Sequence, residues 1–67
     1  MNTQLVNKTF FDCRYNDYFT IGAIARINKH IVKVKMIYST KTERNNWMGL
    51  NDLQYNIEAK QYLPKIT

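Results

Sequence analysis

The sequence has few of the residues that cross-link, break or bend a chain. Its 67 residues include one cysteine, one proline and two glycines. Because Cys13 cannot form a disulfide within its own chain, we expect stability to come from packing or self-association, in a reducing compartment. The two glycines stand alone, which excludes a glycine-rich phosphate-binding loop.

Long apolar runs are missing as well. No stretch approaches the roughly 20 residues of a membrane-spanning helix. The first residues, MNTQLVNKTFF, lack the charged start, apolar middle and cleavage site of a secretory signal. Asn, Lys and Ile make up 22 of the 67 residues, a bias typical of A/T-rich coding. We therefore expect a cytoplasmic protein without a membrane partner, from a low-GC bacterium or, if phage-encoded, in the host cytoplasm.

The composition is that of one small folded domain, residues 1–67. Hydrophobic residues account for 45% of the chain and charged residues for 22%, which is more apolar than a disordered chain. Ten Lys and Arg against five Asp and Glu give a net charge of +5. A basic balance favours an anionic partner, either nucleic acid or an acidic protein surface.

The stretch HIVKVKMIY, residues 30–38, alternates in character and follows a second alternating stretch, residues 19–26. Asn28 and Lys29 lie between them, and Asn tolerates the positive φ of a two-residue hairpin turn. A hairpin closed there has one wholly apolar face, which pairs Ala25 with Val32, Ala23 with Val34, Ile21 with Met36 and Phe19 with Tyr38. Because a slip of one residue would exchange the faces, this agreement predicts the hairpin and its register.

Further elements flank the hairpin. Residues 4–14 are rich in aromatic and β-branched residues and precede the turn-favouring pair Asn16–Asp17, so they form the predicted first strand. A short fourth strand is expected near residues 46–50. For residues 54–63 the pattern leaves two alternatives: a turn at 51–53 followed by a fifth strand, which we favour, or a short helix with Asn51 as N-cap and a Leu50, Leu53, Ile57 stripe.

The segments FTIGAIARIN, IVKVKMIYS and WMGLNDLQ, in this order, resemble the small SH3-like barrels of the KOW and Tudor type over roughly residues 18–56. The five predicted strands by themselves indicate a mainly β fold: a small five-stranded barrel or a strongly curled antiparallel sheet, with a short C-terminal helix as the open alternative. The resemblance implies that the barrel is of the SH3-like type. It also implies a role in binding nucleic acid.

Side chains suited to catalysis are scarce. Nucleophilic catalysis needs a base near the nucleophile, and Cys13 with His30 is the one such pair. We expect Cys13 to be a buried thiol among aromatic residues and His30 to be exposed beside a turn. Structural zinc takes about four Cys or His ligands. The five carboxylates lie in separate turns and strands, so we expect no enzyme, no metal and no other cofactor.

The candidate binding residues lie on the other face of the hairpin and in the loop that follows it. In the predicted register that face combines Arg26, Lys33 and Lys35 with Ile24, Ile31 and Ile37, and Lys29 lies at the tip. The loop STKTERNNW adds Lys41 and Arg44 beside Trp47. Cations can follow phosphates while bases stack on aromatic rings. A tryptophan in so short a chain is nevertheless more often a core residue than a stacking platform.

Three functions compete on this basis. The first is a non-enzymatic, backbone-directed DNA- or RNA-binding regulator of phage or plasmid type. The second is a small protein-binding inhibitor or adaptor that acts on a host enzyme or defence complex. The third is a homodimer or larger self-assembly that closes the isoleucine face. Exposure of Ile24, Ile31 and Ile37 decides whether the hairpin face can bind, because otherwise the loop at 39–47 becomes the candidate.

Overall fold

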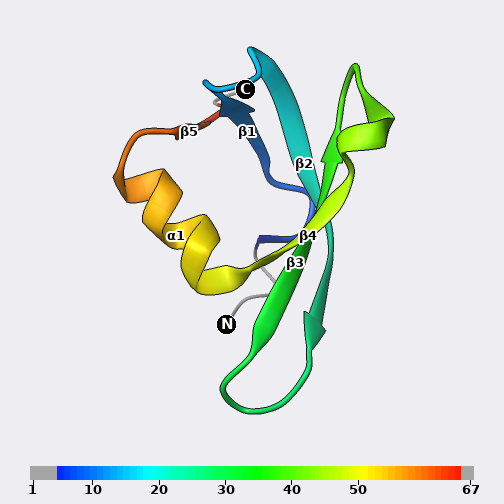
Figure 1. Cartoon of the computed structure of the whole chain (residues 1–67), viewed down its shortest axis with the longest axis vertical. Coiled ribbons are helices and arrows are strands. Elements are labelled where there is room, and N and C mark those ends of the chain that lie inside the picture. Colours follow the sequence, from blue (N-terminus) through cyan, green and yellow to red (C-terminus); the bar gives the residue numbers. More distant parts are fainter. Residues whose placement is uncertain (1–4, 66–67) are drawn as a thin grey trace.

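Five strands form one antiparallel sheet in a computed structural model that describes residues 5–65 (Figure 1). The strand order is β4-β3-β2-β1-β5, so the sheet is open and β4 and β5 are its edges. The elements in chain order are β1 (Thr9–Asp12), β2 (Asp17–Arg26), β3 (Val32–Tyr38), the 3₁₀ helix η2 (Thr42–Arg44), β4 (Asn46–Gly49), α1 (Leu50–Glu58) and β5 (Tyr62–Pro64). The prediction of a mainly β fold is confirmed. Of its two predicted forms, the structure has the curled antiparallel sheet and not the closed barrel.

The first strand is shorter than the predicted 4–14. It is bounded by Asn7 and Asn16, both with positive φ, a conformation that asparagine tolerates and that interrupts a strand. The turn before β2 closes through the Asn16 N–H, which donates to the Asp12 carbonyl at 2.9 Å. Asn16 therefore forms part of a turn, as its sequence context indicates. Gln4, the first residue of the predicted strand, lies outside the described residues.

The central hairpin has the predicted register in one half only. Phe19 pairs with Tyr38, and Ile21 pairs with Met36, as expected. Between Ile21 and Ala23 the register shifts by one residue, so that Ile24 lies opposite Val34. The predicted pairs of Ala23 with Val34 and of Ala25 with Val32 are wrong. A β-bulge adds one unpaired residue, here Gly22. Each later side chain of β2 therefore points to the side opposite to the one predicted.

The tip of the hairpin is a five-residue loop, residues 27–31, and not the predicted two-residue turn. The loop is closed by the Ile27 N–H, which donates to the Ile31 carbonyl at 2.9 Å. The side-chain oxygen of Asn28 accepts hydrogen bonds from the backbone N–H groups of His30 and Ile31. Asn28 thus acts through its side chain, as asparagine commonly does in turns.

Residues 50–58 form the helix α1, so the favoured alternative of a turn and a strand is wrong there; the fifth strand is limited to Tyr62–Pro64. Gly49 is the N-cap, in place of the expected Asn51. The helix ends in a Schellman motif, in which the Lys60 N–H donates to Ile57 and the Gln61 N–H donates to Asn56. Lys60 takes the positive φ that glycine usually supplies. This lysine gave no sequence signal for a helix end.

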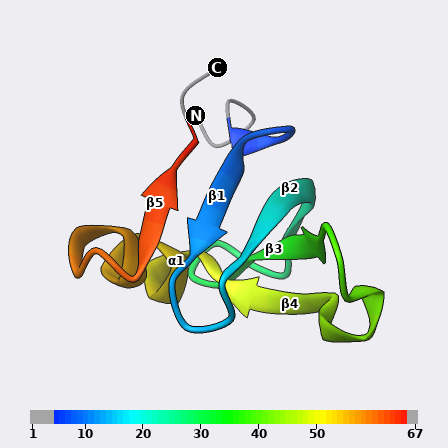
Figure 2. The same cartoon turned by 90° about the horizontal axis from the view of Figure 1, so that it is seen from above.

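The core lies between the concave side of the sheet and α1 (Figure 2). Leu53 is fully buried, and Leu50 and Ile57 pack beside it, so the apolar stripe of the helical alternative is the one that meets the sheet. The buried hydrophobic residues are Phe10, Phe19, Ile21, Val34, Met36, Tyr38, Leu53 and Tyr62. The helix therefore covers the concave side, and no element within residues 5–65 covers the convex side of the sheet.

Candidate functional site

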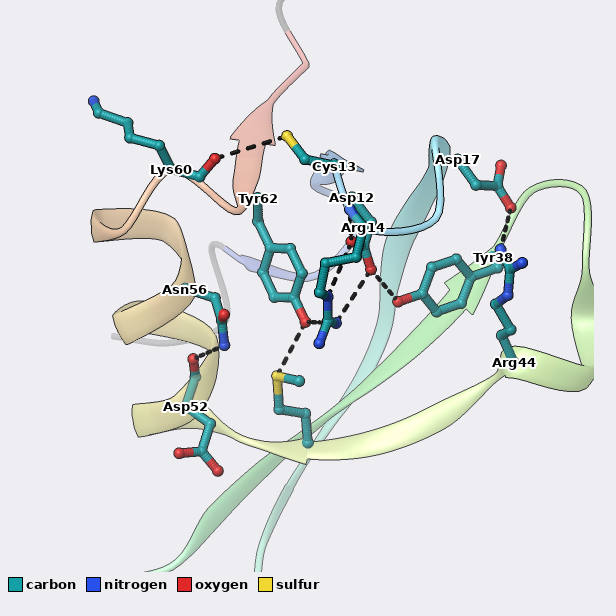
Figure 3. A network of polar contacts seen from close by, with 11 residues as sticks. Asp12, Cys13, Arg14, Asp17, Tyr38, Arg44, Asp52, Asn56, Lys60 and Tyr62 are labelled. Atoms are coloured by element: carbon teal, nitrogen blue, oxygen red, sulfur yellow. Dashed lines mark hydrogen bonds and ion pairs between the residues drawn. The ribbon is translucent and has the colours of Figure 1, made fainter.

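The buried polar groups form a network at the end of the sheet where β1 turns into β2 (Figure 3). Asp12 is fully buried and accepts hydrogen bonds from the backbone N–H of Arg14 at 2.9 Å, from its guanidinium at 3.3 Å and from the Tyr38 hydroxyl at 2.8 Å. The Arg14 guanidinium also donates to the Tyr62 hydroxyl at 2.7 Å. Each oxygen of the Asp12 carboxylate thus has a partner, which a buried charge requires.

This environment shifts the acidity of the groups around Asp12. Burial, and then the hydrogen bond to Asp12, raise the pKa of Tyr38 well above that of free tyrosine. Burial also raises the pKa of Tyr62. The pKa of Arg14 is raised chiefly by its hydrogen bond to Asp12. All three pKa shifts favour the protonated forms, so Tyr38 and Tyr62 stay neutral and Arg14 stays charged at neutral pH.

A second carboxylate, Asp17, ties the loop before β4 to the start of β2. It accepts hydrogen bonds from the Thr40 hydroxyl at 2.8 Å and from the Tyr18 backbone N–H at 2.8 Å. Burial alone would raise the pKa of Asp17, but these bonds and the charge of Arg44, 3.9 Å away, lower it overall. The Arg44 guanidinium lies over the Tyr15 ring, 4.1 Å from its centroid. Arg44 is thus held on the concave side, away from Trp47.

A cleft of about 480 Å³ opens beside these groups. Arg14, Arg44 and Glu43 are among its lining residues. The two guanidiniums face three nearby carboxylates, those of Asp12, Asp17 and Glu43, so the cleft carries no excess positive charge. We therefore regard this end of the sheet as a structural network, because anion binding needs unbalanced cations.

The convex side of the sheet has a different character. Cross-strand pairs place Lys35 between Ala23 of β2 and Trp47 of β4, and Lys33 between Ala25 and Gly49. Residues paired in this way point to the same side of a sheet. We call the following set the lysine face: Ala23, Ala25, Ile27, Lys33, Lys35, Ile37 and Trp47.

The bulge at Gly22 changes which predicted residues belong to this face. Lys33, Lys35 and Ile37 point outward as predicted, and Ile37 is 39% exposed. Ile24 instead lies opposite Val34 and packs against the core, and Arg26 follows on the same side, opposite Val32. The predicted grouping of Ile24 and Arg26 with the two lysines is therefore wrong.

The remaining candidates are dispersed. Lys29 and Ile31 are exposed in the hairpin loop, where Ile31 lines a cavity of about 300 Å³ shared with the start of α1. Lys41 is exposed just before η2. Arg44 stacks on Tyr15, so the predicted cluster of Lys41, Arg44 and Trp47 does not form. Of the candidates predicted in the segment STKTERNNW, Trp47 alone joins the lysine face, and it belongs to β4.

Trp47 is a surface residue, contrary to the expectation of a core tryptophan. Its side chain is 41% exposed. Ala25, Ile27, Lys33 and Trp47 line a shallow groove of about 400 Å³, the convex groove. Ala25 and Ile27 were not among the sequence candidates. Gly22 could have indicated that Ala25 and Ile27 lie on this face, since a glycine inside a strand pattern often marks a bulge, and a bulge reverses the side chains that follow.

The groups considered for chemistry lie far apart. Cys13 precedes β2 and His30 follows it, so the ten residues of β2 separate them (Figure 1). Cys13 is exposed, contrary to the expected buried thiol, and its Sγ is 3.7 Å from the Lys60 carbonyl oxygen. Between residues 5 and 65 no three His, Cys, Asp or Glu side chains gather as a metal site would require. Nor does this part of the chain contain a helix long and apolar enough to cross a membrane.

Comparisons of the chain with protein-family models, curated proteins and solved structures give no match. The resemblance to SH3-like barrels therefore stays a prediction, and the function is argued from the lysine face itself.

Proposed function

We propose that the chain is a non-enzymatic nucleic-acid-binding domain that grips the phosphate backbone with the lysine face. The observation that carries the proposal is the pair Lys33 and Lys35 beside the exposed Trp47. They lie on the convex side of the sheet, which no element of the described residues covers. Lys33 and Lys35 are two residues apart in β3, so their Cα atoms are roughly 6.6 Å apart. The two ammonium groups can therefore contact phosphates of the same nucleic-acid strand.

The distribution of acidic residues supports this assignment. Asp12 and Asp17 are buried and bound by arginine. Glu43 lies in η2, and Glu58 lies in α1, which packs against the opposite side of the sheet. Asp52, at the start of α1, is the one acid near the lysine face within residues 5–65, since its Oδ2 would lie 3.5 Å from a Cβ at Gly49, the partner of Lys33. Neither of the ion pairs found between residues 5 and 65 involves a lysine. The positive charge of Lys33 and Lys35 is therefore available to an external anion.

Lys29 extends the cationic surface. It is exposed in the hairpin loop, whereas Arg26, at the end of β2, lies on the other side of the sheet with Ile24. Each cation that neutralises a phosphate releases counterions, so binding weakens as salt rises. With about three phosphate contacts, affinity for a duplex should fall about 40-fold between about 50 and 200 mM salt.

The test is a titration of fluorescently labelled DNA and RNA at two salt concentrations, with a double variant that removes two charges. Lys33→Gln with Lys35→Gln should weaken binding and reduce the salt slope by about two, since each phosphate contact contributes about one. Lys41→Gln with Lys60→Gln is the matched control, because it also removes two charges and both lysines are exposed outside the lysine face.

Two results would overturn the proposal. One is the absence of binding to either nucleic acid at low salt. The other is a loss for the double variant no larger than the loss for Lys41→Gln with Lys60→Gln, since charge anywhere on the molecule would then be sufficient.

A further inference from the structure

We propose that the convex groove holds one unpaired nucleobase against the indole of Trp47, so that the preferred ligand is single-stranded nucleic acid. The inference rests on the proposed function, because the lysines must first hold the strand. It adds a base-binding site and selects between single and double strands.

The convex groove has a shape that suits a flat ligand. Trp47 is 41% exposed and forms one wall, and Ile27, 61% exposed, is a second lining residue. The residues on either side of Lys33 in the sheet are small: Ala25 lines the groove, and Gly49 pairs with Lys33 on β4. These small residues leave room beside the exposed indole for a flat group.

The groove is bordered by positive charge. Lys33 lines it directly, and Lys35 pairs with Trp47 in the register of β3 and β4. The occupant should therefore combine a flat apolar surface with negative charge a short distance away. A nucleotide within a strand has both, since its base stacks on an aromatic ring and its phosphate meets a lysine.

Base stacking on Trp47 requires single-stranded nucleic acid. In a duplex the bases stack on one another, and their faces are not available to a protein side chain. An indole on an open sheet can stack only on a base that has left such a stack. Because every base has a face of this kind, we expect little sequence preference.

The experiment uses the intrinsic fluorescence of Trp47, the only tryptophan in the chain. The full chain is titrated with a short oligothymidylate, with an abasic strand of the same length and with a duplex, all at low salt. Oligothymidylate should quench the fluorescence. The abasic strand and the duplex should bind through their phosphates and leave the fluorescence nearly unchanged.

Variants then measure the contribution of the ring through the anisotropy of a labelled strand. Trp47→Leu should weaken oligothymidylate binding by about 5- to 150-fold, the range of one base stacked on one ring, and leave the abasic strand unaffected. Trp47→Phe should retain part of the affinity, because it keeps an aromatic face. Tyr55→Leu is the matched control, since Tyr55 is 70% exposed on α1. Circular dichroism confirms that each variant is folded.

The outcomes separate the two proposals. Equal affinities for the base-containing and abasic strands, with no quenching, would overturn the base site and leave the phosphate-binding function standing. Tighter binding to the duplex would also overturn it. No binding to any of the three ligands would overturn the proposed function and this inference together.

Discussion

At the scale of single residues, Asp12 shows how a small core can hold a charge. Its carboxylate is fully buried, yet three groups donate to it: the Arg14 backbone, the Arg14 guanidinium and the Tyr38 hydroxyl. Removing one partner of a buried charge costs far more than removing an exposed ion pair. The sequence places Asp12 among five scattered acids. Arg14 is close in sequence, but the burial of Asp12 cannot be inferred locally, because the neighbouring Tyr38 and Tyr62 come from β3 and β5.

The first prediction concerns Tyr38→Phe. At neutral pH the variant should lose about 1.5–3 kcal/mol of unfolding free energy, the usual contribution of a hydrogen bond to a charged group. In the native protein burial and Asp12 raise the pKa of Tyr38, so above about pH 10 the unfolded chain loses this proton while the folded chain keeps it. The stability of the native protein should therefore fall as pH rises above about 10.

Tyr38→Phe lacks this titrating group, so its stability should fall less steeply over the same alkaline range. Urea unfolding at about pH 7 and at several values above pH 10 measures the difference. Tyr55→Phe serves as control because Tyr55 is exposed. Parallel alkaline losses in the native protein and in Tyr38→Phe would contradict the prediction.

At the scale of elements, one residue in β2 decides what the central hairpin presents on each side. Gly22 is the bulge, and beyond it Ile24 turns to the core while Ala23 and Ala25 turn outward. The position is also crowded. A Cβ at Gly22 would overlap the Cδ1 of Ile37 and lie 3.2 Å from its Cγ1. The absence of a side chain therefore lets Ile37 lie across the bulge.

The second prediction follows from this contact. Gly22→Ala should lower the unfolding free energy by about 1 kcal/mol, the low end for overpacking, because Ile37 is partly exposed and can move outward. In an Ile37→Val background, which lacks Cδ1, the same substitution should cost less than half as much. Chemical denaturation of the four proteins completes the cycle. An equal cost in both backgrounds would show that the strain lies elsewhere.

At the scale of the whole molecule, α1 turns a curled sheet into a protein with a closed core. The structure measures 33 × 24 × 21 Å, and its concave side depends on the helix for cover (Figures 1 and 2). A domain of this size has roughly 3–10 kcal/mol of stability, from about 0.05–0.15 kcal/mol per residue. A single core contact can therefore be a large part of the total.

The third prediction tests this dependence on the helix. Leu53→Ala removes the fully buried side chain of α1 and should cost about 2–5 kcal/mol, enough to leave the chain marginally folded. Leu63→Ala is the matched control on edge strand β5, because Leu63 is 40% exposed. Its cost should be well below that of Leu53→Ala. Thermal unfolding of both variants gives the comparison, and similar losses would mean that α1 contributes little to the core.

The sequence by itself determined the properties that depend on local alternation and on composition. Phe19 and Tyr38 pair as predicted, since a period of two assigns side chains to faces without any distant contact. The fourth strand lies where WMG predicts it. The mainly β class and the net charge of +5 follow from the same local information.

Only the tertiary structure decided the site. A bulge reverses every later side chain in β2, so Arg26 and Ile24 left the face that alternation assigned to them. Residues 50–58 fit both a helix and a strand, and burial of Leu53 against the sheet favoured the helix. Trp47 lies on the convex side of the sheet, where nothing in residues 5–65 covers it, because α1 packs against the other side. Exposure depends on which element packs against which surface, and alternation along one strand carries no record of that.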